Sequence, residues 1–183
     1  MAGNFYERNE RVTSLNITDQ TMQDKIVPLE EAERVAKQLR SEGKRIVLVG
    51  GCFDILHVGH LTFLQKAKEV GDSLFILLES DERIQKLKGE KRPINSQTDR
   101  AHLLSALNMV DYVVLLPLLE TNQGYDKVIL SIKPAIIGTT KYDPNRAHKE
   151  RQAKLTGSKV VDVVERIANK STSRLTAILS EDL

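Results

Sequence analysis

Two histidines three positions apart, His57 and His60, follow a pair of glycines at the start of a segment with helical character. The apolar run 46–49 precedes the glycines and predicts a strand, so the order is strand, glycine turn, helix. Glycine lets a backbone approach a ligand closely, and the first turn of a helix offers free N–H groups and the positive end of its dipole. Both imidazoles lie on one face of that turn and donate hydrogen bonds near neutral pH. The segment therefore predicts a phosphate-binding site.

A histidine pair at this spacing also occurs in metal sites and on ordinary helix surfaces. No cysteine or carboxylate lies at ordinary zinc-ligand spacing beside the pair, so we predict no metal-ligating residue in the chain. Cys52 lies inside the turn. We expect its backbone N–H to matter more than its thiol.

The stretch 51–60 reads Gly-Cys-Phe-Asp-Ile-Leu-His-Val-Gly-His and resembles the signature of the HxGH nucleotidyltransferases, the cytidylyltransferase-like superfamily. Members join a nucleotide to a phosphorylated alcohol or sugar and release pyrophosphate. Within that superfamily the chain is most similar to bacterial D-glycero-β-D-manno-heptose 1-phosphate adenylyltransferases, and next to glycerol-3-phosphate cytidylyltransferases. The similarity runs from about residue 39 to 134 and returns at 171–173.

The resemblance implies that a substrate phosphate oxygen directly displaces pyrophosphate from a nucleoside triphosphate, with the two histidines as catalytic groups. ATP is favoured over CTP, and Mg²⁺ held mainly by phosphate oxygens and water is the expected cofactor. The implied nucleotide-binding residues come from the turn, the first helical turn and a hydroxyl-rich element near the end of the sequence: Gly51, Cys52, Phe53, His57, Gly59, His60, Ser171, Thr172 and Ser173.

A second candidate is the basic stretch 86–95, which combines several cations with a glycine and a proline. Its place between a predicted strand and a predicted helix suggests a mobile loop that closes over a charged substrate. The family resemblance implies catalytic roles for Lys88 and Arg92, which would neutralise phosphates. The alternative is an ordinary solvated basic loop, and Arg100 beyond it could equally cap or pair on the next helix.

Substrate recognition rests on fewer signals. Asp54, Asp81, Lys88 and Lys141 are the candidate substrate-binding residues. Lys141 stands where the heptose enzymes have an acid, and because lysine only donates hydrogen bonds, the exchange points to an acceptor with more negative charge. Asp81 could hold a polyol or a metal-bound water, or simply cap a helix.

The element near the end of the sequence has a similar alternative, since hydroxyl residues such as Ser171 are also good N-caps. Asn169 and Lys170 there depart from the family pattern. His102 and His148 are expected to be bystanders.

Composition agrees with one enzyme domain. The chain has 183 residues, 40% of them apolar, and a formal net charge of +2. A net charge this small does not indicate a basic surface for binding nucleic acid. The single cysteine excludes an internal disulfide. We expect no membrane segment, no signal peptide and a cytoplasmic location. The expected partners are a nucleoside triphosphate and a phosphorylated small molecule, with a homodimer as an open alternative because relatives often pair.

Apolar runs alternate with helical patterns, which predicts a single-domain Rossmann-like three-layer α/β/α fold with a parallel sheet. Ligands then bind at the carboxyl ends of the strands, near a topological switch point. Residues 1–25 are predicted to be a polar N-terminal extension and 26–183 the nucleotidyltransferase domain. The predicted strands are 46–49, 73–78, 112–116, 135–137 and 159–164, and the predicted helices are 28–42, 57–70, 96–109, 125–131, 144–155 and 173–179.

The resulting hypothesis is transfer of AMP from ATP to heptose 1-phosphate. A glycerol-3-phosphate-type cytidylyltransferase or a flavin-forming adenylyltransferase would use the same chemistry on another acceptor. A nucleotide-sensing module without turnover is a further alternative, which the altered Lys141 and Asn169 keep open.

Overall fold

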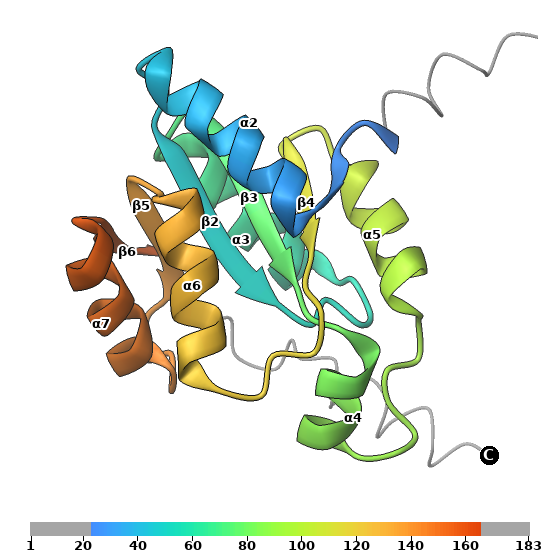
Figure 1. The fold of residues 1–183 in the computed structure, drawn as a ribbon. Coiled ribbons are helices and arrows are strands. Elements are labelled where there is room, and N and C mark those ends of the chain that lie inside the picture. Colours follow the sequence, from blue (N-terminus) through green and yellow to red (C-terminus); the bar gives the residue numbers. More distant parts are fainter. Residues whose placement is uncertain (1–22, 166–183) are drawn as a thin grey trace, which may run out of the picture.

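The computed structural model describes residues 23–165, whose six strands form one sheet in the order β1-β4-β3-β2-β5-β6. Every pair of neighbouring strands is parallel (Figure 1). The strands are β1 (Ile26–Pro28), β2 (Ile46–Gly51), β3 (Ser73–Leu78), β4 (Tyr112–Leu115), β5 (Ile136–Thr140) and β6 (Lys159–Val164). The helices are α2 (Leu29–Ser41), α3 (Val58–Glu69), α4 (Asp81–Lys88), α5 (Gln97–Ser105), α6 (Asn122–Ile132) and α7 (Arg146–Thr156).

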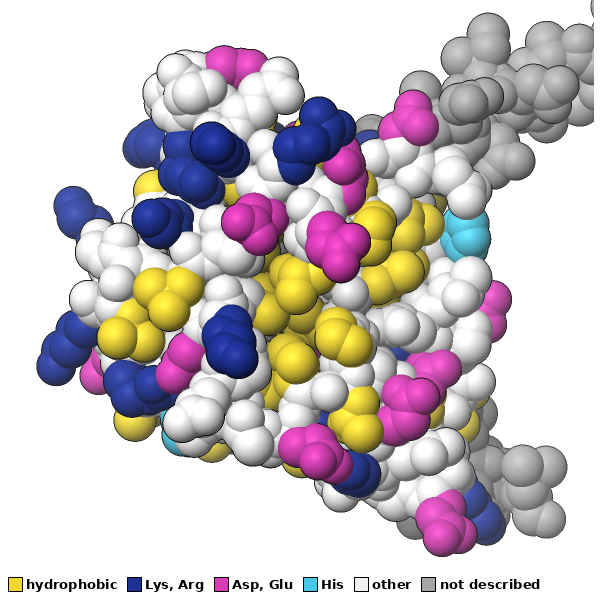
Figure 2. Space-filling view, in the orientation of Figure 1, with side chains coloured by type: hydrophobic (Ala, Val, Ile, Leu, Met, Phe, Trp, Pro, Cys, Tyr) yellow, Lys and Arg dark blue, Asp and Glu magenta, His cyan; other side chains and the backbone are white. Residues whose placement is uncertain are grey.

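Helices cover both faces of this sheet, so the predicted three-layer α/β/α fold is confirmed (Figure 1). The side chains of each strand alternate between the two faces. In β2, Ile46 and Leu48 pack with α2, α6 and α7, whereas Val47 and Val49 pack with α3 and α5. Figure 2 shows apolar side chains over the middle of the face that carries α2 and α6, with lysines and arginines gathered mainly at its upper left and left.

The strand order places a topological switch point beside β2. From β2 the chain adds β3 and then β4 on one side, and it then returns to add β5 and β6 on the other side. In such a sheet a crevice opens at the carboxyl ends of the strands where the direction of winding reverses. The glycine turn that ends β2 lies at this place.

Strand β1 was not predicted. It has three residues, too few to show a period in the sequence, and it adds to the edge of the sheet beside β4. The Val113 N–H donates to the Lys25 carbonyl at 2.8 Å. Pro28 ends this strand and is the N-cap of α2, so the helix predicted to open at Pro28 begins at Leu29.

Helix α4 corrects the prediction of a loop over 86–95, because Lys86 and Lys88 lie in its last turn. The Ser80 hydroxyl oxygen accepts a hydrogen bond from the Arg83 N–H at 3.2 Å and caps the helix, and Asp81 lies in the first turn. The loop begins at Gly89, whose φ of 97° ends the helix.

The other predicted elements within the described range are present. Strands β3 and β6 have the predicted bounds, and most of the remaining elements differ by a few residues at their ends. Within residues 23–165 no helix has both the length and the apolar character needed to cross a bilayer. The helix predicted at 173–179 lies outside the described residues.

Candidate active site

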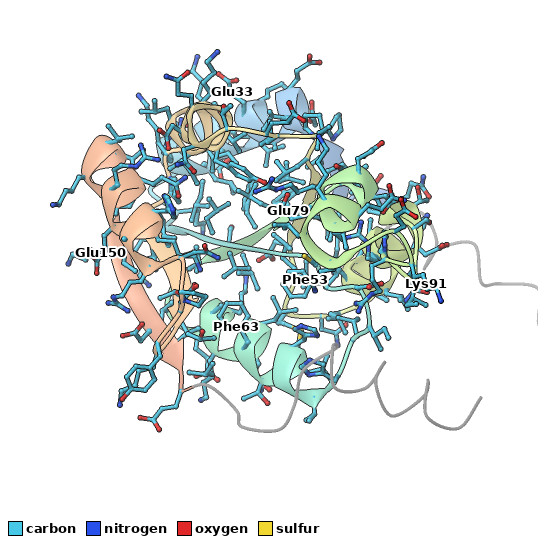
Figure 3. The ribbon with its side chains drawn as sticks, turned by 90° about the horizontal axis from the view of Figure 1, so that it is seen from below. Glu33, Phe53, Phe63, Glu79, Lys91 and Glu150 are labelled. Carbon is cyan, nitrogen blue, oxygen red and sulfur yellow. The ribbon has the colours of Figure 1, made fainter. Side chains whose placement is uncertain are left out.

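A cavity of about 1040 Å³ opens at the carboxyl edge of the sheet. Figure 3 looks onto this edge and shows Phe53, Phe63 and Glu79 around the same opening. Small-molecule sites usually measure roughly 300 to 1,000 Å³, so the space suits a nucleotide together with a small acceptor. Seven of the predicted nucleotide-binding and catalytic residues line it: Gly51, Cys52, Phe53, His57, Gly59, His60 and Lys88.

The glycine turn owes its shape to the contact between Gly51 and Phe53. A Cβ on Gly51 would lie 2.9 Å from the Phe53 Cε2 atom, so a side chain there would collide with the ring. Phe53 itself has a φ of 46°, in the left-handed region that non-glycine residues rarely adopt. This conformation turns the chain from β2 toward the helix that carries the histidines.

His57 and His60 lie together, as the sequence predicts. Their rings stack with centroids 3.9 Å apart and planes at 21°. The Gly59 N–H donates to the His57 Nδ1 at 3.1 Å, and this makes His57 the side-chain cap of α3. Because Nδ1 accepts, the proton of the neutral His57 ring lies on Nε2, which can donate to a phosphate oxygen.

His60 is held in its neutral form. Burial lowers its pKa to about 4, the neighbouring His57 and Lys88 add to this effect, and a hydrogen bond with the Ile55 backbone opposes it. Its ring also contacts Phe53, with centroids 5.1 Å apart. Near neutral pH this imidazole therefore serves as a neutral hydrogen-bonding group without a charge of its own.

Asp54 and Arg92 pair with each other in the interior. The Arg92 Nε donates to Asp54 Oδ2 at 2.6 Å, and Asp54 Oδ1 accepts from the N–H groups of Ile94 and Asn95 at 2.8 and 3.1 Å. These bonds lower the pKa of Asp54 against the opposing effect of burial. Asp54 is 1% exposed and Arg92 8%. This geometry favours a structural role for both over the predicted contact with substrate.

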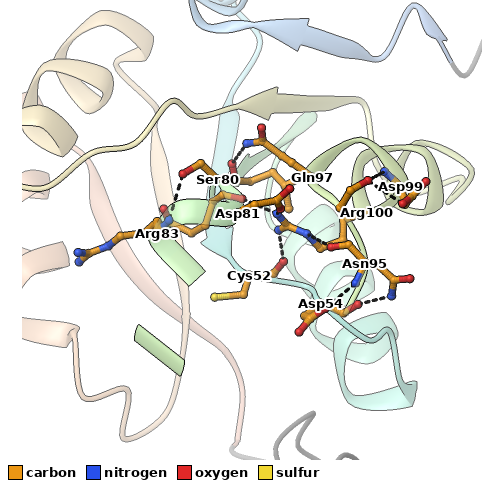
Figure 4. A network of polar contacts seen from close by, with 12 residues as sticks. Cys52, Asp54, Ser80, Asp81, Arg83, Asn95, Gln97, Asp99 and Arg100 are labelled. Atoms are coloured by element: carbon orange, nitrogen blue, oxygen red, sulfur yellow. Dashed lines mark hydrogen bonds and ion pairs between the residues drawn. The ribbon is translucent and has the colours of Figure 1, made fainter. Parts of the chain in front are cut away.

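Arg100 joins the ends of two strands, a role that sequence reasoning missed. Its side chain is fully buried and donates to the carbonyls of Cys52 at 2.6 Å and Glu79 at 2.8 Å (Figure 4). It also donates to Asp81 Oδ1 at 2.7 Å. Asp81, predicted to bind substrate, is thereby held beside Arg100 and does not line the cavity.

Lys141 does not line the cavity itself, but its ammonium group pairs at 2.8 Å with Glu165, which lies at the cavity margin, and both side chains are exposed. The neighbouring residues point inward instead. Asp143 Oδ2 accepts from Thr139 and Lys149 at 2.6 Å each. His148, expected to be a bystander, lies on the same wall of the cavity.

The comparisons with known proteins agree with this geometry. The family model described as Cytidylyltransferase-like matches residues 48–178, which is most of the chain. The chain belongs to this family. The match includes the glycine turn, both histidines and the hydroxyl-rich element after β6.

Relatives of this cytidylyltransferase-like chain include proteins named Bifunctional protein HldE. The protein from Nitratiruptor sp. is 46% identical over 132 residues, which are 72% of this chain and 26% of that protein. The protein from Wolinella succinogenes is 55% identical over 115 residues, which are 63% of this chain and 23% of that protein. The chain thus spans about a quarter of the length of these relatives.

Two solved structures support the family fold. The lipopolysaccharide core biosynthesis protein from Thermoplasma volcanium is 29% identical, with a TM-score of 0.52 over 70% of this chain and 100% of that chain. Pantoate-beta-alanine ligase from Francisella tularensis is 14% identical, with a TM-score of 0.59 over 85% of this chain and 76% of that chain. The second likeness concerns the fold alone.

Two further residues on the cavity wall of this cytidylyltransferase-like domain escaped sequence reasoning. The Tyr125 hydroxyl donates to Glu79, with oxygen distances of 2.9 and 3.1 Å to the two carboxylate oxygens. Burial raises the pKa of Glu79, and Tyr125, Arg83 and Arg100 oppose that rise. Glu79 directly follows the apolar run of β3, and a charged residue at that place is a usable signal. Tyr125 gave none.

The predicted nucleotide contacts of Ser171, Thr172 and Ser173 lie outside the described residues. In the described part, residues 23–165, no three His, Cys, Asp or Glu side chains gather in a way that could hold a metal ion.

Proposed function

We propose that this chain transfers AMP from ATP to heptose 1-phosphate and releases pyrophosphate. The stacked histidines at the glycine turn, open to a large cavity in a cytidylyltransferase-like chain, carry the proposal. The similarity to the heptose enzymes favours ATP and a sugar phosphate over the glycerol phosphate and flavin alternatives.

The reaction is a direct displacement at phosphorus. An oxygen of the acceptor phosphate forms a bond to the α-phosphorus of ATP, while the bond from that phosphorus to the bridging oxygen breaks and pyrophosphate leaves with the electron pair. The acceptor phosphate is already ionised, so the step needs neither a protein nucleophile nor a strong base. Catalysis then consists of positioning and charge stabilisation.

The chain has groups for both tasks. The His57 Nε2–H donates to an oxygen of the α-phosphate, the neutral His60 ring stacks on His57 and holds it in place, and the positive end of the α3 dipole favours the negative charge. Lys88 reaches the cavity from the end of α4 and supplies a positive charge from the other side. Arg92 supplies none in this scheme, because Asp54 neutralises it.

The cofactor proposal is a divalent ion, Mg²⁺, that arrives with ATP and is held by phosphate oxygens and water. Such an ion neutralises phosphate charge when it is bound. The described residues form no ligand cluster of their own, so no protein ligand is assigned to it. The roles of Ser171, Thr172 and Ser173, the homodimer and the cytoplasmic location stay predictions.

A pyrophosphate-release assay with ATP, CTP, GTP and UTP against a panel of phosphorylated acceptors tests the proposal. We expect release with ATP and heptose 1-phosphate. Release only with CTP and glycerol 3-phosphate, or with a flavin precursor, would replace the proposed acceptor. Tight nucleotide binding without release from any pair would identify a sensing module.

His57→Ala tests the mechanism. We expect kcat/KM to fall by about 10² to 10³-fold, the usual effect of removing one donor to developing charge. His102→Ala is the matched control, since His102 is exposed on α5 and lies outside the cavity. A His57→Ala enzyme with full activity would contradict the assignment.

A further inference from the structure

One wall of the cavity carries a carboxylate and a phenol that phosphate binding does not explain. Glu79 follows the end of β3, Tyr125 lies in α6, and both line the cavity. Figure 3 shows Glu79 at the edge of the opening. A carboxylate repels phosphate groups, so its place in an anion-binding cavity calls for another kind of ligand.

The two side chains form a pair with spare hydrogen-bonding capacity. The Tyr125 hydroxyl lies 2.9 and 3.1 Å from the two oxygens of Glu79. Burial raises the pKa of Tyr125 to about 12, so the phenol keeps its proton and donates it. An ionised carboxylate has about four lone-pair sites, and Tyr125 has only one hydrogen to give. Glu79 can therefore accept further hydrogen bonds from a ligand.

The backbone fixes this pair beside the phosphate-binding turn. The Glu79 N–H donates to the Gly51 carbonyl at 3.3 Å, and the Glu79 carbonyl accepts from Arg100 at 2.8 Å. Arg83 lines the same wall, and its Nε atom is buried without a hydrogen-bond partner among the described residues. The wall thus offers an acceptor, the Glu79 carboxylate, that a ligand can satisfy, with the Arg83 cation beside it.

The charges narrow the class of ligand. Glu79 calls for a hydrogen-bond donor, which is either a hydroxyl or an amine. The cations of Arg83 and Lys88 lie on the same side of the cavity and disfavour a second positive charge there. Neighbouring hydroxyls of a sugar both donate and accept, and they match the carboxylate and the phenol oxygen.

We propose that Glu79, held by Tyr125, accepts hydrogen bonds from the hydroxyls of the acceptor sugar and so determines acceptor specificity. This inference rests on the proposed function. The wall lies between β3, α4 and α6, whereas β6, the strand that precedes the predicted nucleotide-binding hydroxyl residues in the sequence, lies on the other side of β2. The sugar is therefore assigned to the β3 side.

The test compares Glu79→Gln and Tyr125→Phe with the wild type in pyrophosphate release. Glu82→Gln is the matched control, an exposed acid in α4 outside the cavity. For Glu79→Gln we expect kcat/KM for heptose 1-phosphate to fall about 10- to 100-fold, as for the loss of a hydrogen bond to a charged group, while the KM for ATP stays unchanged. Tyr125→Phe keeps the ring and should cause a smaller loss in the same direction.

Heptose 1-phosphate analogues that each lack one hydroxyl distinguish a substrate contact from a structural role. The measured quantity is the loss of kcat/KM caused by each missing hydroxyl. At least one analogue should be a poorer acceptor for the wild type, and this penalty should disappear in Glu79→Gln. If every analogue remains as poor an acceptor in Glu79→Gln as in the wild type, the sugar subsite is overturned. A raised KM for ATP in Glu79→Gln would overturn it too, and would indicate that Glu79 contacts the ribose of ATP. A wild type that releases no pyrophosphate with any acceptor would overturn the proposed function as well.

Discussion

Lys88 and Arg92 lie four residues apart in one basic stretch, yet they end in opposite surroundings. Lys88 ends α4, is exposed and lines the cavity. Arg92 is buried and bonded to Asp54. Two cations that look equivalent in the sequence thus have different surroundings: one lines the cavity, and the other is bonded to the loop that leads into α3.

The reason is the partner that the fold supplies. A buried charge without a counter-charge is costly, so Arg92 can be interior only because Asp54 meets it there. Lys88 remains hydrated and needs no such partner. Substitutions at the two sites should therefore affect different properties, stability at Arg92 and activity at Lys88.

Breaking the buried pair should cost most. We expect Arg92→Ala to lower the free energy of unfolding by about 3 to 5 kcal/mol, because it leaves the Asp54 carboxylate buried and unpaired. Urea titration followed by circular dichroism measures this. The exposed neighbour supplies the control, and Lys91→Ala should change stability by less than about 0.5 kcal/mol. Equal effects of the two variants would show that the pair is not structural.

Removing the cation at the cavity should change activity and leave stability unchanged. For Lys88→Ala we expect kcat/KM to fall about 10- to 100-fold, the effect of losing one charged hydrogen bond to phosphate. Lys86→Ala is the control, because Lys86 pairs with Glu120 outside the cavity. Normal turnover by Lys88→Ala would show that Lys88 does not act in catalysis. A loss of stability like that of Arg92→Ala would show that the two residues do not differ in role.

Acid should weaken the fold through His60. Its folded pKa of about 4 lies below the ordinary value of 6.5, so the unfolded chain binds the proton more readily. This contribution to stability is complete above pH 6.5 and is lost as the pH falls toward 4. We expect His60→Asn to show a shallower fall of the urea midpoint over that window than the wild type. Parallel curves would mean that His60 titrates normally in the folded state.

The smallest effect belongs to Lys141. Its ion pair with Glu165 is exposed, so we expect Lys141→Ala to change the free energy of unfolding by less than about 0.5 kcal/mol. The KM for the acceptor should also stay within about twofold, since less than about 0.5 kcal/mol is involved. A clear rise in that KM would restore the substrate contact that the sequence predicted.

Sequence reasoning was most successful where the signal was local. Strand β3 is an unbroken apolar run, and the spacing of His57 and His60 within one helical turn brings them together in any such helix. It failed for β1, which is too short for a period, and for α4, where the charges concealed a helix that Ser80 caps.

Sequence reasoning did not predict contacts between residues that lie far apart in the chain. Asp54 meets Arg92 across 38 positions, and Tyr125 meets Glu79 across 46. Each pair depends on which strand ends and loops the parallel sheet places side by side. The type of a charged residue does not reveal whether it will face a partner or the solvent.

The family, the alternation of strands and helices, and the turn that presents two imidazoles could all be predicted from the sequence, because these depend on residue type and short spacing. Which charges reach the cavity depends on how the folded chain brings distant segments together. The order of the strands sets which side chains meet at the carboxyl edge of the sheet, and burial then allows an ion pair such as Asp54 with Arg92 while leaving Lys88 free to face a ligand.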